Sequence, residues 1–478
     1  MKTKTLYSIT LTIFIIWCSI PRGIAQTNVN QPTSYNNDIP LEPTCASFSF
    51  MEFLNKQNPQ FLELSEELLK NSLKKGHRNN HLKSDIYKIP IVFHVVYNSE
   101  EENLPDSVIH NQLEILNKAF RRQNVDTINL RSEFLDIVGD ARIEFELASI
   151  DPNGNSTNGI TRTYTDVKYF GGVLPYNSSQ NEEITNWVND SLLYNLFRLS
   201  NSVLGGTNSW NEDEYLNVWI GDLRVLEPSM GNFEELVYFA LATPPLYYHE
   251  NWPYETINMI SPFSQGILIH YVNVGANNSN LLPLPYSSYN SKTKSGKILV
   301  HEIGHYFGLR HIWGDGGCTM DDYIDDTPNS SYGSSFDCNL TKNTCTDNIN
   351  GEDLPDMIEN YMDYSDGNCQ NSFTIKQIEL MRNMIVNHRP KLIFNESFTG
   401  PIIMSVYPNP IINELNINLA LNEEGIDIQI IDVQGKLVYR NFYNNETQIK
   451  INPFLRKGIY FLSIDNGSEK EMIKLMKY

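Results

Sequence analysis

The chain is 478 residues long and carries 57 acidic against 36 basic residues, giving a formal net charge of -21 at pH 7. An excess of negative charge this large argues against nucleic acid or an anionic membrane surface as a partner. The length exceeds that of an ordinary single domain and predicts several parts in series.

The first 25 residues have the pattern of an export signal. Lys2 and Lys4 precede an apolar run over residues 11–17, and small residues follow at 23–25. This arrangement predicts a removable signal peptide over residues 1–25. The run is shorter than the roughly 20 apolar residues that span a bilayer, and no later run is long enough, so we expect no transmembrane segment in the mature protein.

Residues 26–88 are interpreted as a propeptide. The segment ends in polar and basic residues, as expected of an exposed linker open to processing: Lys74, Lys75, Arg78 and Lys83. A catalytic domain of mixed α+β (α/β) class is expected over residues 89–393. Apolar residues at helical spacing over 108–122 predict a helix above a sheet, and residues 265–271 predict a strand.

The most informative motif is HExxHxxGxxH at residues 301–311. His301 and His305 are four residues apart, so on a helix both face the same metal ion. Gly308 permits a sharp turn that returns His311 as a third ligand. Three protein ligands leave one position open, which is typical of a catalytic rather than a structural zinc site.

Glu302 lies beside the open position and is not needed as a ligand. We therefore predict that it is the general base that activates a zinc-bound water and later protonates the leaving amine. The alternative is a chance pattern on an amphipathic helix, which the added glycine and third histidine disfavour.

Four of the six cysteines cluster after the motif, at Cys318, Cys338, Cys345 and Cys369. An even number in an exported chain indicates two disulfides, and the sequence alone leaves all three pairings open. A second metal site is the competing interpretation. The same region is rich in acidic residues, of which Asp321, Asp325 and Asp326 are candidate calcium ligands, although such a run is more often a solvated surface.

A methionine between aromatic residues, Met362, follows the motif at the position of a Met-turn. Together with the motif, the segments at residues 89–97, 158–163, 325–328 and 360–366 make the chain resemble the pappalysin family of metzincin proteases. The resemblance covers roughly residues 89–389. It implies a metzincin-like fold with a zinc-binding active-site helix, and a cleft bordered by a strand that precedes this helix.

The resemblance also assigns roles to individual residues. It implies His301, His305 and His311 as zinc ligands, Glu302 as base and Met362 as the turn methionine. It implies that the hydroxyl of Tyr364 stabilises the oxyanion of the tetrahedral intermediate. It further favours the disulfides Cys318–Cys345 and Cys338–Cys369, and structural calcium near the acidic loop.

Two positions depart from what the family leads us to expect. Cys45, in the propeptide, would fill the open zinc position and keep the proenzyme latent, but the family's neighbouring Arg and Gly are missing, and a spare thiol is the alternative. Asn368 stands where an acidic residue would set a preference for cutting before Arg or Lys. A neutral amide cannot pair with a buried cation, so basic specificity requires Asp366 or another acid.

Residues 404–478, after a linker at 394–403, change to short alternating strands. Ile426, Ile428 and Ile430 alternate with polar neighbours, which predicts a small all-β sandwich-like domain with one buried face per strand. Segments 406–410, 435–436 and 458–460 resemble the C-terminal sorting domain of type IX secretion, whose machinery would then be a partner. A carbohydrate-binding or adhesive sandwich is the alternative.

The sequence thus predicts a latent, secreted zinc endopeptidase, extracellular or attached to the cell surface, that hydrolyses extracellular proteins or peptides. The competing function is a surface adhesin on a degenerate metzincin fold. The intact Glu302 argues against it, because an inactive relative would be expected to lose the base or a ligand.

Overall fold

The computed structural model describes residues 45–74, 86–173, 192–229, 232–245, 263–282, 286–290, 294–349, 351–393, 403–411, 414–419, 426–443, 448–465 and 470–477. The expected signal peptide, the basic residues Lys75, Arg78 and Lys83, and most of the expected linker lie outside these residues. In the part of the chain that is described, every helix is too short or too polar to cross a lipid bilayer.

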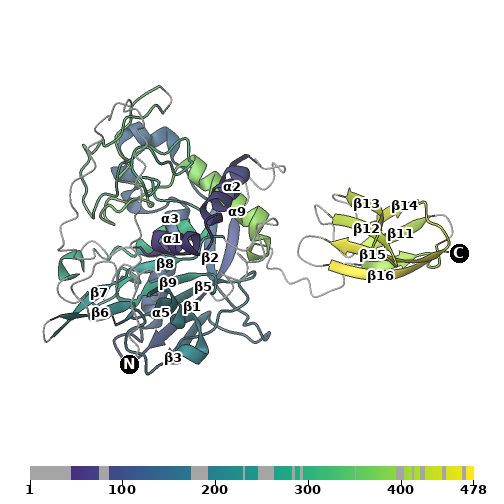
Figure 1. Cartoon of the computed structure of the whole chain (residues 1–478), viewed down its shortest axis with the longest axis horizontal. Helices are drawn as coiled ribbons and strands as arrows, with labels where there is room; N and C mark the ends of the chain where they lie inside the picture. Colours follow the sequence, from purple (N-terminus) through teal and green to yellow (C-terminus); the bar gives the residue numbers. More distant parts are fainter. Residues whose placement is uncertain are drawn as a thin grey trace, which may run out of the picture. The chain divides into compact units, whose positions relative to one another are not determined.

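A six-stranded sheet forms the core of the catalytic region (Figure 1). Its order is β2-β1-β5-β9-β8, and β3 also pairs with β1. All neighbours are parallel except β8, which runs antiparallel to β9 at one edge. The strands are β1 (Tyr87–Tyr97), β2 (Ile143–Leu147), β3 (Ile160–Tyr164), β5 (Leu216–Gly221), β8 (Ala240–Ala242) and β9 (Ile267–His270).

Strand β1 is buried from Ile91 to Val96, which agrees with its apolar sequence, because a parallel strand is covered on both faces. The predicted helix over 108–122 is α3 (Asp106–Phe120), and the predicted strand over 265–271 is β9. The expectation for the cleft border needs refinement. β9 is internal to the sheet, and the free edge is β8, which precedes it in the chain.

The zinc motif begins on α8 (Ile298–Tyr306), a helix whose residues Leu299–Tyr306 are all buried and which packs against β8 and β9. The region ends in α9 (Ile375–His388), whose first turn is closed by a capping box between Thr374 and Gln377. The remaining helices and strands are α5 (Leu193–Phe197), β4 (Gly172–Val173), β6 (Arg224–Ser229) and β7 (Asn232–Val237). Short 3-10 helices span Val125–Asn129, Ser132–Ile137, Arg198–Ser200, Ser202–Leu204, Tyr271–Asn273, Tyr286–Tyr289 and Pro390–Leu392.

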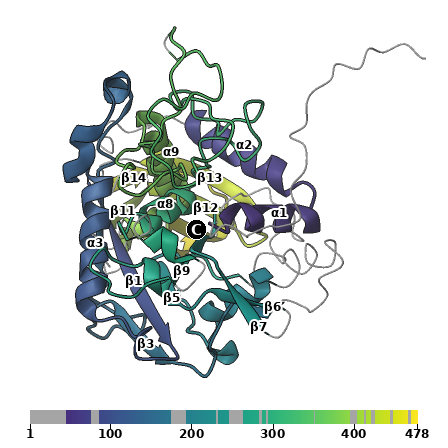
Figure 2. The same cartoon turned by 90° about the vertical axis from the view of Figure 1, so that its left-hand side faces the viewer.

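Two helices of the expected propeptide, α1 (Ser47–Gln57) and α2 (Phe61–Lys74), pack on the catalytic region. α2 lies beside α9 in both views (Figure 1, Figure 2). Strand β1 begins at Tyr87, so the expected boundary between residues 88 and 89 falls inside a strand.

The C-terminal region consists of two antiparallel sheets, ordered β10-β11-β14 and β13-β12-β15-β16. Their strands are β10 (Ile403–Tyr407), β11 (Leu415–Leu419), β12 (Ile426–Asp432), β13 (Leu437–Tyr443), β14 (Gln448–Ile451), β15 (Gly458–Asp465) and β16 (Lys470–Lys477). Aliphatic side chains from both sheets form one buried cluster, so the region is a sandwich. Ile426, Ile428 and Ile430 point into it, which confirms the predicted alternation.

Candidate metal centre and active site

Three histidines converge at the end of α8. Their Nε2 atoms face one another, 3.0 Å apart between His301 and His305 and 3.1 Å apart between His305 and His311. Gly308 makes this possible, because it turns the chain with φ +93°, in the left-handed region.

Each histidine ring is oriented by a hydrogen bond at its Nδ1 atom. The partners are acceptors: the Tyr361 carbonyl at 2.7 Å for His301, the Leu309 carbonyl at 2.8 Å for His305, and the Asp315 carboxylate for His311. The Nδ1 atoms therefore carry the protons, and the three Nε2 lone pairs point into the centre, as metal ligation requires. Burial lowers the pKa of His301 to about 3 and that of His305 well below its usual value, so both are neutral at pH 7.

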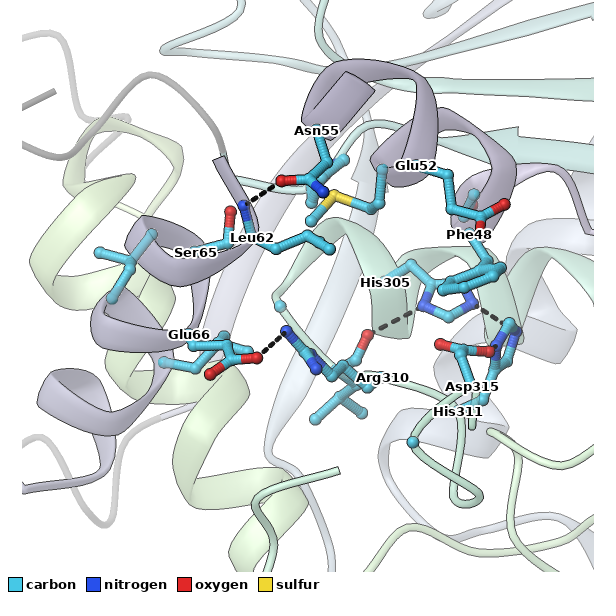
Figure 3. A pocket seen from close by; sticks show the side chains of 18 of the residues that line it. Phe48, Glu52, Asn55, Leu62, Ser65, Glu66, His305, Arg310, His311 and Asp315 are labelled. Atoms are coloured by element: carbon cyan, nitrogen blue, oxygen red, sulfur yellow. Dashed lines mark hydrogen bonds and ion pairs between the residues drawn. The ribbon is translucent and has the colours of Figure 1, made fainter. Parts of the chain in front are cut away.

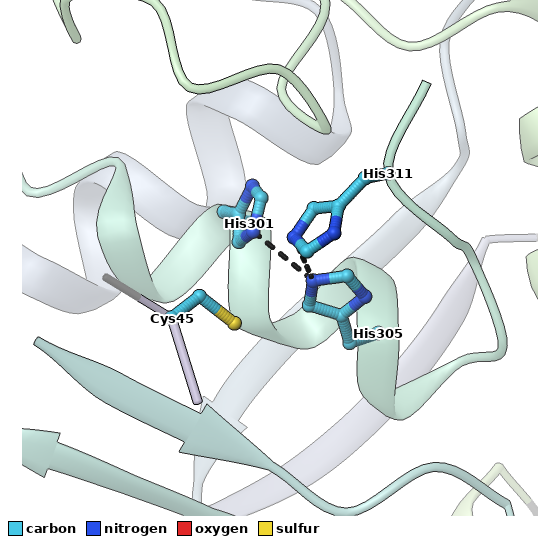
Figure 4. A group of neighbouring side chains, drawn as sticks. All are labelled: Cys45, His301, His305 and His311. Atoms are coloured by element: carbon cyan, nitrogen blue, oxygen red, sulfur yellow. Dashed lines mark hydrogen bonds between the residues drawn. The ribbon is translucent and has the colours of Figure 1, made fainter. Parts of the chain in front are cut away.

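Cys45 completes this group (Figure 4). The donor atoms of Cys45, His301, His305 and His311 all lie within 4.8 Å of one another, and they are the one such group found among the described residues. Three imidazoles and the sulfur of a cysteine are a full tetrahedral donor set for zinc, so the residues present fit this metal. Without a bound metal, burial raises the pKa of the Cys45 thiol well above its usual value, and the charge of Glu302 is the second cause of this shift.

Glu302 is fully buried beside the histidines. Burial raises the pKa of its carboxyl to about 7. Its Oε2 accepts a hydrogen bond from the Ser47 hydroxyl at 3.1 Å, and that hydroxyl in turn accepts from the Ala242 backbone N–H at 2.9 Å. The Oε1 atom has no partner among the described residues.

Tyr364 and Met362 border the site on its other sides. The Tyr364 ring lies 4.8 Å from the His311 ring, and its hydroxyl donates to the Cys45 carbonyl at 3.5 Å. Met362 packs under α8 so closely that a Cβ at Gly304 would come within 2.4 Å of its sulfur. Gly304, at an unspecified position of the motif, thus leaves the space that the turn methionine fills.

The cysteine-rich loop contains the two disulfides that the resemblance implied. Cys318 pairs with Cys345 and Cys338 with Cys369, with Cα atoms 5.5 Å and 6.1 Å apart. A second metal site at these cysteines is therefore wrong.

The three calcium candidates are placed differently from one another. Asp321 and Asp325 are exposed, whereas Asp326 is partly buried and its Oδ1 has no partner among the described residues. Its neighbours Asp322 and Thr327 also have buried oxygens without a partner there. Burial raises the pKa of Asp322 well above its usual value.

Asn368 is exposed, and its backbone and side-chain N–H groups both donate to the Asp366 carboxylate at 2.9 Å. It is not among the residues that line the small cavity of about 40 Å³ beside Cys45 and Glu302. The walls of that cavity are largely apolar and include Phe239, Ile298 and Phe336.

Sequence reasoning missed several residues of the site. Ser47 contacts the base, Asp315 orients His311, and Trp313 stacks on the His311 ring at 4.3 Å. Asp315 and Trp313 lie within four residues of the motif, so proximity to His311 could have indicated them. Ser47 carried no such signal.

The site combines two histidines one helical turn apart with a third histidine after a glycine turn. It also has a buried glutamate beside them and a methionine beneath them. This combination is typical of the metzincin metalloproteases. More narrowly, the chain belongs to the pappalysin family. Residues 263–386 match the profile described as pregnancy-associated plasma protein-A, and residues 405–478 match the secretion system C-terminal sorting domain. This sorting domain marks the protein for export across the outer membrane.

Solved structures agree with this assignment. A Tannerella forsythia promirolysin mutant is 31% identical, with a TM-score of 0.55, and the match covers 75% of this chain and 100% of that one. Mirolysin in complex with compound 9 is 33% identical, with a TM-score of 0.50, over 66% of this chain and 100% of that one.

Curated relatives match over a shorter stretch. The extracellular metalloprotease of Pyricularia oryzae is 42% identical over 100 residues, which are 21% of this chain and 33% of that protein. The corresponding protein of Arthroderma benhamiae is 42% identical over 90 residues, 18% of this chain and 29% of that protein. The chain therefore spans about a third of the length of these curated relatives.

Proposed function

We propose that this protein is a secreted zinc endopeptidase, made as a latent proenzyme, that hydrolyses peptide bonds in extracellular proteins or peptides. The observation that carries the proposal is the convergence of three histidine Nε2 atoms beside a buried glutamate with one free carboxylate oxygen. A site that only had to hold zinc for stability would not need that glutamate.

When bound, zinc supplies Lewis acidity, which polarises the scissile carbonyl and acidifies a water molecule. Glu302 takes the proton from the attacking water and passes it to the leaving amine. Tyr364 donates its hydroxyl to the oxyanion once the propeptide carbonyl that now accepts it has left.

The edge strand β8 is proposed to hold the substrate. Its outer side is taken in the proenzyme by residues 45–46: Cys45 forms a parallel bridge with Ala240, and the Ala46 N–H donates to the Ala240 carbonyl at 2.9 Å. An extended peptide could make the same kind of backbone pairing after the propeptide leaves.

Latency is proposed to arise at two atoms at once. The Cys45 thiol would occupy the fourth zinc position, and the Ser47 hydroxyl engages the carboxylate of the base. The parallel bridge to Ala240 and the close donor group favour the cysteine switch over a spare thiol. Processing is proposed to occur before Tyr87, since β1 begins there.

Three further proposals concern a structural calcium ion, docking to the secretion machinery and substrate preference. The buried oxygens of Asp322, Asp326 and Thr327 that have no partner among the described residues support a structural calcium ion in the disulfide loop. The sorting domain supports docking to the type IX secretion machinery. Asn368 is neutral and its amide is bonded to Asp366, so it supports no preference for cutting before Arg or Lys.

The test is mass-spectrometric profiling of a proteome-derived peptide library with the propeptide-free enzyme, a chelator control and Glu302→Ala. We expect cleavage that chelation and the substitution both abolish. A folded, zinc-loaded protein that cuts nothing would contradict the proposal and leave the adhesin alternative in its place.

A further inference from the structure

The propeptide contacts a second surface of the enzyme, beside the zinc motif and separate from the contacts of Cys45 and Ser47. This surface consists of helix α9, the turn after α8 and one residue of the disulfide loop. We call it the α9 surface and define it as Gly308, Arg310, Tyr323, Asn383, Met384 and His388. Helix α2 lies along it (Figure 2).

Polar contacts fix the C-terminal end of α2 on this surface. The Asn383 amide donates to the Ser72 carbonyl at 2.9 Å, and the Ser72 hydroxyl lies 3.3 Å from Nε2 of His388. Ser72 is only 1% exposed, so both contacts are shielded from water. Carbonyls in the last turn of a helix lack a partner within the helix, and Asn383 supplies one here.

Apolar contacts fix the middle of the helix. Leu68 and Leu69 are buried. A Cβ at Gly308 would lie 3.3 Å from Leu69 Cδ2 and 3.3 Å from atoms of Met384, so the leucine sits where the motif glycine leaves room. The same glycine that turns the chain towards His311 therefore also receives the propeptide.

Charged groups complete the contact at the solvent side. Glu66 lies 3.8 Å from Arg310 (Figure 3). The Tyr323 ring receives Arg310 at 4.9 Å and Lys70 at 4.5 Å. Such partly exposed pairs add little affinity by themselves but restrict the orientation of the helix.

Helix α1 is anchored independently of Cys45 as well. Phe50 packs on Phe197 and Phe263 with ring centroids 5.3 Å and 5.2 Å apart, and Phe53 packs on Tyr194 at 5.4 Å. A cavity of about 340 Å³ is lined by residues of both helices and by His305 and His311; Figure 3 shows its lining side chains. Both helices of the propeptide therefore have buried contacts that do not involve the thiol.

We propose that the α9 surface is an exosite for residues 61–74 of this chain. Its occupation keeps the propeptide in place even when the thiol has left the metal, and the excised segment remains bound as an inhibitor of the mature enzyme. Loss of the Cys45 contact alone then leaves the cleft covered. The inhibition rests on the proposed protease function, whereas the docking does not.

Hydrogen–deuterium exchange of the full chain tests the docking without any need for activity. Wild type and Cys45→Ser are compared with and without a chelator. We expect residues 45–47 to exchange faster in the variant and after chelation, while residues 61–74 stay within two-fold of wild type. An isolated helix of 14 residues would be largely unprotected, so a rise at 61–74 in step with 45–47 would overturn the proposal.

Substitutions on both sides of the contact make the test specific. Leu69→Asp should raise exchange over 61–74 at least ten-fold, and Asn383→Leu, on the enzyme's side, several-fold. Glu63→Asp is the matched control, because it places the same residue type on an exposed position of the same helix and should change nothing. If the exchange rate over residues 61–74 is unchanged in both the Leu69 and the Asn383 variants, the α9 surface is not an exosite for this segment.

Activity then tests inhibition. Uncut full-chain Cys45→Ser should remain at least ten-fold less active than the processed enzyme, and adding Leu69→Asp, but not Glu63→Asp, should release most of that activity. Full activity of uncut Cys45→Ser would overturn the proposal. If no form cleaves any peptide, the protease function fails, while the exchange data still decide whether α2 docks as proposed.

Discussion

The catalytic region and the C-terminal sandwich bury different kinds of side chain. The catalytic region holds charged and polar groups in its interior, among them Glu302, His305 and Asp363. In the sandwich, Ser463 is the one buried polar residue among those described, and the rest of the core is aliphatic or aromatic. A buried polar group costs free energy unless it is paired, so the first region gives up stability for chemistry and the second does not.

Buried polar atoms without a hydrogen-bond partner also distinguish the catalytic region from the sandwich. Among the described residues, all buried side-chain N and O atoms that lack a hydrogen bond belong to the propeptide and catalytic region, and they include Glu302 Oε1 and Asp322 Oδ2. Such atoms are expected where water, a metal or a substrate will bind. The comparison therefore predicts that substitutions of polar groups at the metal centre change activity, and that substitutions in the core of the sandwich change stability alone.

The largest effect is expected for Glu302→Gln in the processed enzyme. The amide fits the same space but cannot accept the proton of the attacking water, so kcat should fall by about 10²–10⁴-fold. Zinc content should stay at one ion per chain, because Glu302 is not a ligand, which metal analysis of the same sample checks. Retention of more than a tenth of wild-type kcat would contradict its role as base.

Tyr364→Phe should have the next largest effect. It removes a donor proposed for the oxyanion, which typically costs about 10²-fold in kcat with little change in KM. Tyr361→Phe is a matched control three residues away, since the Tyr361 hydroxyl is buried and has no partner among the described residues. Steady-state kinetics should separate the two variants, and equal losses in both would mean that Tyr364 acts only through packing.

Ile428→Ala should lower the stability of the sandwich and leave peptide cleavage unchanged. Ile428 is fully buried in the sandwich, and a cavity of this size costs about 2–5 kcal/mol. Val438→Ala, at a position 40% exposed, serves as the control. Denaturant unfolding followed beside a peptide-cleavage assay checks both statements, and an activity loss of more than two-fold in the Ile428 variant would break the comparison.

The local features of both regions could be predicted from the sequence. The spacing of His301, His305 and His311 is a property of one helix and one turn, and the alternation of Ile426, Ile428 and Ile430 is a property of one strand. These features depend on neighbours in the chain, so composition and spacing were sufficient to find them.

Contacts between distant segments could not be predicted in this way. Ser47 meets Glu302 across 255 residues, and nothing in the local sequence of either marks the pair. The free edge at β8 depends on the strand order of the whole sheet. In the acidic loop, the density of carboxylates could not rank the aspartates, whereas burial distinguishes Asp322 and Asp326 from the exposed Asp321 and Asp325.

The smallest effect concerns a buried polar residue of the catalytic region that takes no part in the chemistry. His94 lies between Thr161 and Asn217, at 2.8 Å and 3.0 Å, and burial lowers its pKa to about 4. The unfolded chain, with a pKa near 6.5, binds a proton more readily than the folded one. The folded state is therefore favoured above pH 6.5, and this contribution is lost as the pH falls towards 4. Between pH 7 and 5 the loss of folding free energy should be about 2 kcal/mol.

Denaturant unfolding at pH 7 and at pH 5 measures this loss. In His94→Gln, which keeps a neutral amide between the two partners, the difference in stability between the two pH values should be smaller by the same amount. If the pH dependence of stability is the same in the variant, the buried histidine is not its source, and carboxylates elsewhere in the acidic chain must account for it.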